Sequence, residues 1–496
     1  MKRPLTLIAL LAACSAVAIG ACGALAQAQQ VPAAPSAATA ALSPATPLAS
    51  NVQELTAKAT ALGGKLGLRI VQVQSGAVLA EVNPQLPLNP ASNMKIVTAA
   101  VLLDRLGPNY HFVTGLYGKK VGSEVAELVL RGRGDPSLSA SDLLSLARSL
   151  QRSGVTKVGA ILVDQSYFDA QFVPPAFDEQ PDEWAPFRAP VSAVSVDGNA
   201  VTLNVQPTTP GSPARIWFGP EDVFATAGQV LTKEAGSGQH IGWTLKPQSS
   251  GLGSVVSGSV AADLPRQQFQ KRLHDPRLVP GQALRGMLLD LGVQVGDRVL
   301  EGGADAKELL ASRESPALSE LVTHLGKDSD NFYAETLLKV LGAEQAGAPG
   351  TSAAGSSAII KWLDEHQALV PGTQIINGSG LFNADRVSAA TLCATLRAAF
   401  LDPRLQPEYV AQLSIAGVDG TLRLRLKSLA AQRSVRGKTG TLNSTVALSG
   451  YALGQSPTST IAFSMIVDGV SGHHSEFRQR FDAIAVQLAA QAAAAH

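Results

Sequence analysis

Cysteine and charged residues are both scarce in this sequence. Three of its 496 residues are cysteines, and Asp, Glu, Lys and Arg together make up 16%, with a formal net charge of +1. Cys14 lies in an N-terminal segment that we expect to be removed, and Cys22 lies near the end of that segment, so Cys393 has no obvious partner. No disulfide framework is available, so the hydrophobic core must be stable without disulfide bonds. The balanced charge also gives no electrostatic footprint for nucleic acid.

Several motifs that would indicate other chemistries are absent. The sequence has no zinc-ligand spacing, no phosphate-binding loop and no dinucleotide fingerprint. His473 and His474 stand together without an H-E-x-x-H pattern or a third ligand. There is no G-x-S-x-G elbow of the kind that α/β-hydrolases carry. We therefore predict no cofactor, no metal, and no nucleotide or nucleic-acid partner.

The N-terminus is predicted to be a targeting segment. Two basic residues precede an apolar run over residues 5–19, which is too short and wrongly flanked to span a membrane. We assign residues 1–26 to a signal sequence, cut either after Ala24-Leu25-Ala26 or before Cys22, where the preceding string resembles the lipobox of bacterial lipoproteins. Cys22 is thus a candidate lipid anchor and the one predicted attachment to a membrane. Residues 27–50, rich in Ala, Pro and Ser, are predicted to be a disordered linker.

The rest of the chain is predicted to be an α+β protein with a split domain. Strand patterns at 66–73 and 77–82 near the front, and at 434–441, 445–452 and 460–467 near the end, can form one antiparallel sheet with helices on its faces. Between them, residues 113–279 show short strand-like runs separated by Gly, Pro and Ser clusters. We predict a catalytic domain made of residues 51–112 and 280–496, interrupted by a β-rich insert of one or two small domains.

Ser92 and Lys95 lie three residues apart at the start of an apolar helical pattern that ends at Gly107. Residues i and i+3 are neighbours on a helix, so the Lys95 ammonium can reach the Ser92 hydroxyl. A hydroxyl needs an adjacent base to become a nucleophile, and a buried lysine can have its pKa lowered enough to act as that base. Alone, however, this pair is better explained by a helix cap and a solvated lysine.

Two further strings change that balance. Ser329-Asp330-Asn331 precedes a helical pattern, and Lys438-Thr439-Gly440 lies in the strand pattern at 434–441. Singly, they would be an N-cap cluster and an exposed strand with a bulge. In this order, S-x-x-K, S-x-N and K-T-G form the motif set of penicillin-binding proteins and β-lactamases.

The chain resembles the penicillin-binding D-alanyl-D-alanine carboxypeptidases and endopeptidases of the low-molecular-mass class C type, DacB-like members of the serine penicillin-recognising superfamily. Ser92 and Ser329 are farther apart than in a β-lactamase, as in relatives that carry a large insert. Three more strings are similar to that family: Gly132-Arg133-Gly134-Asp135-Pro136-Ser137-Leu138, Gly378-Ser379-Gly380-Leu381, and the string from Ile415 to Leu422. The resemblance implies a β-lactamase/transpeptidase-like fold and a location in the bacterial periplasm or cell envelope.

The resemblance also implies the role of each catalytic residue. Ser92 attacks the carbonyl of a D-Ala-D-Ala bond in a peptidoglycan peptide, and Lys95 takes its proton. Ser329 passes a proton to the leaving amine, and Asn331 holds Lys95 and the substrate amide. Water then hydrolyses the acyl-enzyme, whereas a β-lactam acylates Ser92 in the same way and is released slowly.

The K-T-G strand is implied to bind the substrate. Lys438 and Thr439 suit the substrate's terminal carboxylate, and Gly440 lets the strand approach the peptide closely. The backbone N–H groups of Ser92 and Thr441 hold the oxyanion. The charge of Lys438 is also expected to lower the pKa of Lys95.

One departure and two alternatives accompany this hypothesis. Relatives commonly have an arginine after the G-S-G-L string, where this chain has Asn383, and the nearby Arg386 is at the wrong offset. The G-S-G string itself favours a turn over a second nucleophile. The alternative functions are a β-lactamase or esterase of the same superfamily, and a non-catalytic module that binds the wall or senses penicillin.

Overall fold

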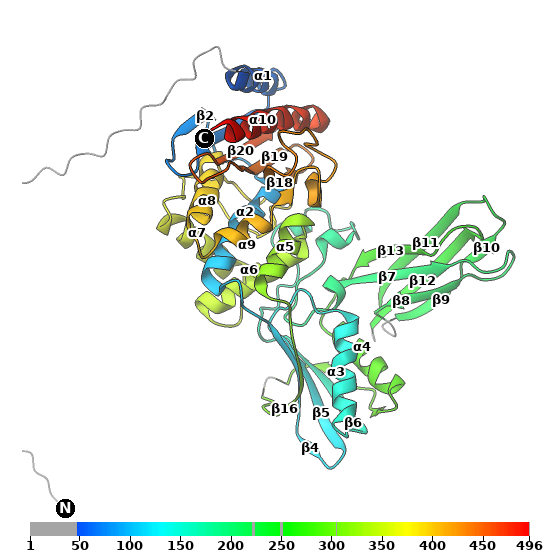
Figure 1. Ribbon diagram of the computed structural model, residues 1–496. Helices are drawn as coiled ribbons and strands as arrows, with labels where there is room; N and C mark the ends of the chain where they lie inside the picture. Colours follow the sequence, from blue (N-terminus) through cyan, green and yellow to red (C-terminus); the bar gives the residue numbers. More distant parts are fainter. Residues whose placement is uncertain (1–46, 221–223, 249–250, 304, 496) are drawn as a thin grey trace, which may run out of the picture. The chain divides into compact units, whose positions relative to one another are not determined.

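The computed structural model describes residues 47–220, 224–248, 251–303 and 305–495 (Figure 1). The predicted signal sequence, the candidate anchor Cys22 and most of the predicted linker lie outside these residues. The last residues assigned to the linker are helical instead, because helix α1 already begins at Pro47. Proline is tolerated in the first turn of a helix, where its missing N–H has no intrahelical partner.

A six-stranded antiparallel sheet joins the front of the chain to its end. The strand order is β17-β18-β19-β20-β1-β2. Strand β1 pairs with β20 along its whole length, from Lys65 opposite Asp468 to Gln72 opposite Ile461. The predicted antiparallel sheet is therefore confirmed, and β17 adds a strand that was not predicted. The strands are β1 (Lys65–Gln72), β2 (Val78–Val82), β17 (Ser414–Ile415), β18 (Val435–Thr441), β19 (Val446–Ala452) and β20 (Ile461–Asp468).

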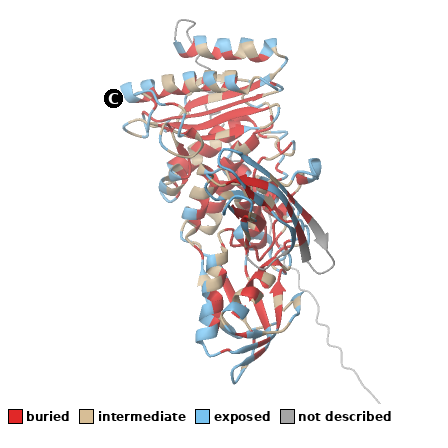
Figure 2. Cartoon of the chain, turned by 90° about the vertical axis from the view of Figure 1, so that its right-hand side faces the viewer, coloured by how far each residue is buried: buried red, intermediate tan, exposed pale blue. Residues whose placement is uncertain are grey.

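Helices cover both faces of this sheet, so its central strands β19 and β20 are apolar without alternation and almost entirely buried (Figure 2). Helices α1 and α10 pack on one face, and α8 with the start of α2 packs on the other (Figure 1). The helices of this part are α1 (Pro47–Ala61), α2 (Met94–Leu106), α5 (Leu318–Lys327), α6 (Asn331–Ala346), α7 (Ser352–Glu365), α8 (Ala389–Leu401), α9 (Gln406–Ala411) and α10 (His474–Ala494), with 3-10 helices η1 (Ala91–Asn93) and η5 (Gly420–Leu422).

Helix α2 is the central helix of the larger core. Every residue from Met94 to Leu103 is buried, because helices α5, α6, α7, α8 and α9 all contact α2. The helix ends at Gly107, whose φ of 84° is a conformation that glycine adopts without strain.

A second sheet belongs to the insert. It has seven strands, in the order β14-β6-β5-β3-β16, with β15 paired to β6 and β4 paired to β5. Its elements are β3 (Val113–Tyr117), β4 (Lys120–Val121), β5 (Glu124–Arg131), α3 (Ala140–Arg152), β6 (Lys157–Asp164), α4 (Val279–Asp290), β14 (Gln294–Val295), β15 (Val299–Glu301) and β16 (Leu309–Glu314). Two smaller sheets, β13-β7-β8 and β10-β12-β11 with β9 on β12, lie within the same stretch of chain.

The small sheets share one core of their own, which contains Leu203, Trp243 and Val256. Their strands are β7 (Ala200–Gln206), β8 (Arg215–Gly219), β9 (Phe224–Gly228), β10 (Leu231–Lys233), β11 (Gln239–Gln248), β12 (Gly251–Ala261) and β13 (Gln267–Arg272). Short 3-10 helices precede them: η2 (Phe177–Glu179), η3 (Pro186–Arg188) and η4 (Asp197–Asn199).

The predicted end of the insert at residue 279 is wrong. Helix α4 and strands β14 to β16, which we had assigned to the catalytic domain, complete the seven-stranded sheet of the insert. A helical pattern resumes at α4, but periodicity does not reveal which sheet a helix covers. The insert returns at Ser315, whose N–H donates to Phe112 O (2.9 Å) while the Phe112 N–H donates to Ser315 Oγ (2.9 Å).

Candidate active site

Ser92 lies in a tight turn immediately before the central helix. The sequence predicted that the helix itself begins at Ser92, but the serine is the middle residue of 3-10 helix η1 and α2 begins at Met94. Ala91 has a φ of 48°, an uncommon value for a residue with a side chain. Ser92 is half-buried, and its Oγ lies 3.4 Å from Lys95 Nζ. The serine and the lysine are therefore neighbours, as their spacing predicted.

Lys95 is fully buried, and its Nζ contacts three oxygen atoms. Its ammonium donates to Asn331 Oδ1 (2.7 Å) and to the backbone oxygen of Ser379 (2.8 Å), in addition to facing Ser92. Burial lowers the pKa of Lys95 to about 8, although the carboxylates of Glu335, Asp330 and Asp385 each raise it. A lysine with this pKa is neutral in roughly a tenth of molecules at pH 7, against fewer than about one in a thousand for an ordinary lysine.

The turn between α5 and α6 brings Ser329 and Asn331 to the same place. Ser329 has a φ of 59°, and Asp330 caps α6 by accepting the N–H of Tyr333 (3.1 Å). Ser329 Oγ accepts from Lys438 Nζ at 2.7 Å, while Asn331 bonds Lys95. The two serines and two lysines of the motifs are thus linked in pairs through this turn.

Lys438 reaches the turn from strand β18. It is fully buried and also donates to its neighbour's backbone oxygen, Thr439 O, at 3.0 Å. Burial lowers the pKa of Lys438 well below its ordinary value, and the positive charge of Lys95 lowers it further. We had expected burial and the charge of Lys438 both to lower the pKa of Lys95. Burial does lower it, whereas the repulsion lowers the pKa of Lys438.

Gly440 allows β18 to lie against the serine turn. A Cβ at this position would be 3.0 Å from both Ala91 Cβ and Pro90 O, and 3.1 Å from Ala447 Cβ. The close approach that we assigned to the substrate is therefore already made by the protein's own backbone. Thr439 Oγ1 donates to Thr421 Oγ1 (2.8 Å), and the exposed Thr441 ends the strand.

Glu335, which the sequence did not single out, also belongs to the site. Glu335 is buried one turn after Asn331 on α6 and accepts the N–H groups of Gly378 (3.2 Å) and Ser379 (2.8 Å). This orients the turn whose Ser379 oxygen binds Lys95, so the G-S-G string is a turn, as predicted, with a part in the site. Gly380 is required there, since a Cβ would lie 1.8 Å from Ala91 O. The i+4 spacing of Glu335 from Asn331 was the available signal.

The insert contributes directly to the site. Asn331 Nδ2 donates to the backbone oxygen of Phe187 (3.1 Å), which belongs to η3 in the insert. A cavity of about 470 Å³ opens beside Ser329 and Asn331, and its opposite wall includes Phe187, Ser137 and Gln270. Nothing in the sequence around Phe187 or Gln270 predicts this position, because both are brought there by the fold of the insert alone.

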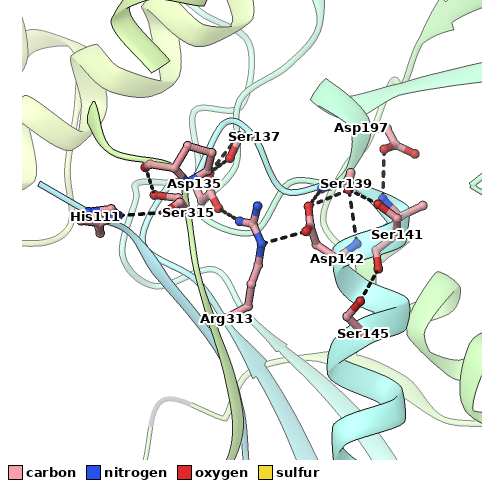
Figure 3. A network of polar contacts seen from close by, with 12 residues as sticks. His111, Asp135, Ser137, Ser139, Ser141, Asp142, Ser145, Asp197, Arg313 and Ser315 are labelled. Atoms are coloured by element: carbon pink, nitrogen blue, oxygen red, sulfur yellow. Dashed lines mark hydrogen bonds and ion pairs between the residues drawn. The ribbon is translucent and has the colours of Figure 1, made fainter. Parts of the chain in front are cut away.

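The G-R-G-D-P-S-L string shapes this cavity through a buried carboxylate. Asp135 accepts the N–H of Ser137 (2.8 Å) and forms an ion pair with Arg313 of β16 (Figure 3). Arg313 Nε also lies 3.0 Å from Asp142 Oδ1, in the first turn of α3. One guanidinium therefore ties β16 and α3 to the loop that carries Ser137.

Arg386 does not replace the missing arginine near Asn383. Its guanidinium donates to Asp385 O (2.7 Å) and to Asn383 Oδ1 (2.8 Å), and so it binds its own loop. The side chain of Asp385 is buried, accepts the N–H of Ile376 (2.7 Å), and has its pKa raised by burial to about 7. Within the described residues, no helix is long and apolar enough to cross a membrane, and no three His, Cys, Asp or Glu side chains are grouped as metal ligands.

Comparison with known proteins gives one consistent family. The model of the D-Ala-D-Ala carboxypeptidase 3 (S13) family matches residues 48–491. A D-alanyl-D-alanine carboxypeptidase of Actinomadura sp. (strain R39) is 32% identical over 465 residues, covering 90% of this chain and 85% of that protein. D-alanyl-D-alanine carboxypeptidase DacB of Haemophilus influenzae is 24% identical, covering 85% of this chain and 88% of the relative. The crystal structure of penicillin binding protein 4 (dacB) from the same organism superimposes with a TM-score of 0.72 at 22% identity, over 89% of this chain and 98% of the other.

Proposed function

The chain belongs to the D-Ala-D-Ala carboxypeptidase 3 (S13) family of serine peptidases, and from this membership we propose that it cleaves D-Ala-D-Ala stem peptides of peptidoglycan through an acyl-enzyme on Ser92. The observation that carries the assignment of the nucleophile is the buried Lys95, whose Nζ lies 3.4 Å from Ser92 Oγ and whose pKa is lowered to about 8. Neutral Lys95 takes the Ser92 proton as Oγ attacks the substrate carbonyl.

Strand β18 supplies the substrate contacts in this mechanism. Strand β17 pairs with β18 only at Gly437 and Arg436, so among the described residues no strand is hydrogen-bonded to that edge from Lys438 to Thr441. An extended peptide can add to such an edge as a further strand. Its terminal carboxylate then meets Lys438, and the N–H groups of Ser92 and Thr441 stabilise the oxyanion.

Ser329 is the proton donor to the leaving D-alanine. Its Oγ accepts from Lys438 Nζ at 2.7 Å, so a proton given to the amine by Ser329 is replaced from Lys438. The proton that Lys95 took from Ser92 then restores Lys438, and neutral Lys95 acts again as the base for the water that attacks the acyl-enzyme. A β-lactam presents a carboxylate and an acylating carbonyl to the same groups, and we propose that it acylates Ser92.

Covalent labelling tests the nucleophile. The wild type should carry fluorescent penicillin on the peptide that contains Ser92, and Ser92→Ala should carry none. Ser357→Ala, which removes an exposed hydroxyl from α7, serves as the control and should label like the wild type. An adduct on any other residue would contradict the assignment.

Product analysis tests the reaction. Purified peptidoglycan incubated with the protein, but not with Ser92→Ala, should release D-alanine that mass spectrometry detects. Cleavage of cross-linked peptides in the same digest measures endopeptidase activity, which we propose uses the same serine. Intact peptides after incubation with the wild type would overturn the proposed function.

We further propose that the protein is exported to the bacterial cell envelope. The charged and apolar pattern of residues 1–26 supports a signal sequence, and Cys22 offers the one candidate for lipid attachment. The mass of the N-terminal peptide of the mature protein distinguishes cleavage after Ala26 from lipid on Cys22. A retained Met1 would overturn the proposal.

A further inference from the structure

The three-stranded sheet β13-β7-β8 has two chemically different faces. Val201, Leu203 and Val205 of β7 are buried in the core that this sheet shares with the neighbouring four-stranded sheet. Alternate residues of a strand point the other way. On that second face, the register places Asn204 between Trp217 and Gln268, and Thr202 between Gly219 and Gln270.

Side-chain amides form short ladders across this second face. Gln268 Nε2 donates to Asn204 Oδ1 (2.9 Å), and Gln270 Nε2 donates to Thr202 Oγ1 (3.2 Å). Both glutamines are exposed, so their remaining donors and acceptors face solvent. The ladders fix the amides in place and leave them able to bind hydroxyl and amide groups of a ligand.

Trp217 lies on the same face between two arginines. The guanidinium carbons of Arg215 and Arg266 are 5.7 Å and 6.0 Å from the centroid of its ring. Trp217 is half-buried and both arginines are exposed. Two cations held beside an aromatic ring are suited to a ligand that carries both carboxylates and a face able to stack.

This face reaches the cavity beside the α5–α6 turn. Gln270 lines the cavity that also contains Ser329 and Asn331. From Gln270 the face extends along β13 through Gln268 to Arg266, the residue before the strand, a distance of about 14 Å at the rise of an antiparallel strand. A polymer lying on the face therefore has one of its parts at the cavity that contains Ser329 and Asn331.

We propose that the face formed by Gln270, Gln268, Trp217, Arg215 and Arg266 binds the glycan strand of peptidoglycan while a stem peptide enters the cavity beside Ser329 and Asn331. The proposal rests on the proposed function, because it takes the occupant to be the polymer that carries the substrate. Amino sugars offer N-acetyl amides and hydroxyls to the glutamines, and the apolar face of a sugar ring to the tryptophan. Carboxylates along the wall polymer complement Arg215 and Arg266.

Binding and turnover separate this surface from the catalytic residues. In a Ser92→Ala background, Trp217→Ala and the double variant Arg215→Gln/Arg266→Gln should each co-sediment with purified peptidoglycan about tenfold more weakly than the parent. With Ser92 intact, the same variants should release D-alanine more slowly from peptidoglycan, with unchanged kcat/KM on a free pentapeptide. Arg148→Gln/Arg152→Gln on α3 removes two exposed charges from the same insert and should behave like the parent.

A third arm identifies the occupant. Glycan strands freed of stem peptides by an amidase should still bind the parent and bind the Trp217→Ala variant about tenfold more weakly. Undiminished binding of the variants, an equal loss on the free pentapeptide, or no binding to stripped strands would each overturn the proposal. If the wild type released no D-alanine from any peptide, the proposed function would fail, while sedimentation would still report on the surface.

Discussion

Lys95 owes its chemistry to burial more than to any single neighbour. Three carboxylates act to keep it charged, yet its pKa is lowered to about 8 because the ammonium has no access to water. Its two short hydrogen bonds, to Asn331 and Ser379, fix the nitrogen at a point from which it faces Ser92. The proposed base is therefore both neutralised and positioned by elements distant in sequence.

The pH dependence of acylation should follow this group. With a chromogenic β-lactam, the acylation rate should rise with pH through a midpoint near 8, because only neutral Lys95 accepts the Ser92 proton. Lys95→Arg keeps the charge, removes the base and should acylate at least about a thousandfold more slowly. Lys438→Ala should slow acylation through lost carboxylate binding but leave the midpoint near 8, since burial sets it. A midpoint that rises by a full unit in Lys438→Ala would show that repulsion, and not burial, sets the pKa.

At the scale of elements, the α5–α6 turn is held by a histidine. His324 Nδ1 lies 2.9 Å from Asp328 Oδ2, and Nε2 lies 3.2 Å from Asp330 Oδ2, so the ring spans the turn that carries Ser329. The Tyr333 ring of α6 lies against it in a tilted arrangement, with ring centroids 4.3 Å apart and an angle of 48° between the ring planes. The hydrogen bond and charge of Asp330, then the charge of Asp328, raise the pKa of His324 although burial lowers it. The adjacent Lys327 is paired with Asp419.

Replacing His324 should loosen this turn. His324→Gln should acylate several-fold more slowly, because Ser329 and Asn331 lose a support for their positions. A raised folded-state pKa gives stability that is fully present below ~6.5 and is lost as pH rises through the folded value. The difference in Tm between wild type and His324→Gln should therefore be largest in acid and shrink as pH rises. His240→Gln, an exposed histidine of β11, is the control; an equal effect there, or a difference that grows with pH, would contradict this role.

The contact between β18 and the serine turn gives a second prediction at this scale. Gly440→Ala should push the strand away from Pro90 and Ala91, slow acylation roughly tenfold and destabilise the fold by about 1–3 kcal/mol. Gly437→Ala on the same strand is the matched control, because its Cβ would meet only Leu422 Cδ1 (3.2 Å) and Leu448 Cδ1 (3.4 Å) closely, both ends of flexible side chains. Stopped-flow acylation and urea unfolding measure the two effects. Equal acylation rates for Gly440→Ala and Gly437→Ala would contradict a role for the close contact at Gly440.

At the scale of the whole molecule, we propose that the chain is one catalytic domain with two nested modules. The outer insert leaves at Phe112 and returns at Ser315, and its residues Phe168, Ala189, Val191 and Ala193 are buried in the catalytic core. The inner module, β7 to β13, begins and ends side by side, since Leu273 N–H donates to Asn199 O (2.9 Å). The inner module therefore joins the rest of the chain at one place and has a hydrophobic core of its own. The outer insert instead contributes residues to the catalytic core.

Excision distinguishes the two modules. Joining Asn199 directly to Leu273 should give a folded protein that fluorescent penicillin still labels, because the residues around Ser92 and Phe187 are retained. Joining Phe112 to Ser315 should give an insoluble or unlabelled protein, since the apolar side chains that 168–193 covers would be exposed. In-gel fluorescence measures the labelling of both deletion variants, and circular dichroism measures whether they fold. A soluble, labelled product of the larger excision would refute the nesting.

The local strings were predictable and the long-range contacts were not. Ser92 and Lys95 meet through helical spacing alone, and the strand patterns near both ends predicted their sheet. Glu335 and Phe187 enter the site through tertiary packing, which leaves no periodic trace in a single sequence. The end of the insert was misplaced because the apolar pattern of α4 would be the same whichever sheet the helix covered. Strand β17 was missed because a strand of two residues is too short to show an alternating pattern.

The hydrogen bonds of Lys95 also impose an order in time. Its partners Asn331 and Ser379 follow it by 236 and 284 residues. At a synthesis rate of roughly 5–20 residues per second, tens of seconds pass between the making of the serine and lysine and the arrival of the groups that position them. Ser92 and Lys95 are thus synthesised early, and the residues that position Lys95 are synthesised late. An unfinished chain therefore contains Ser92 and Lys95 without the two groups that position the lysine.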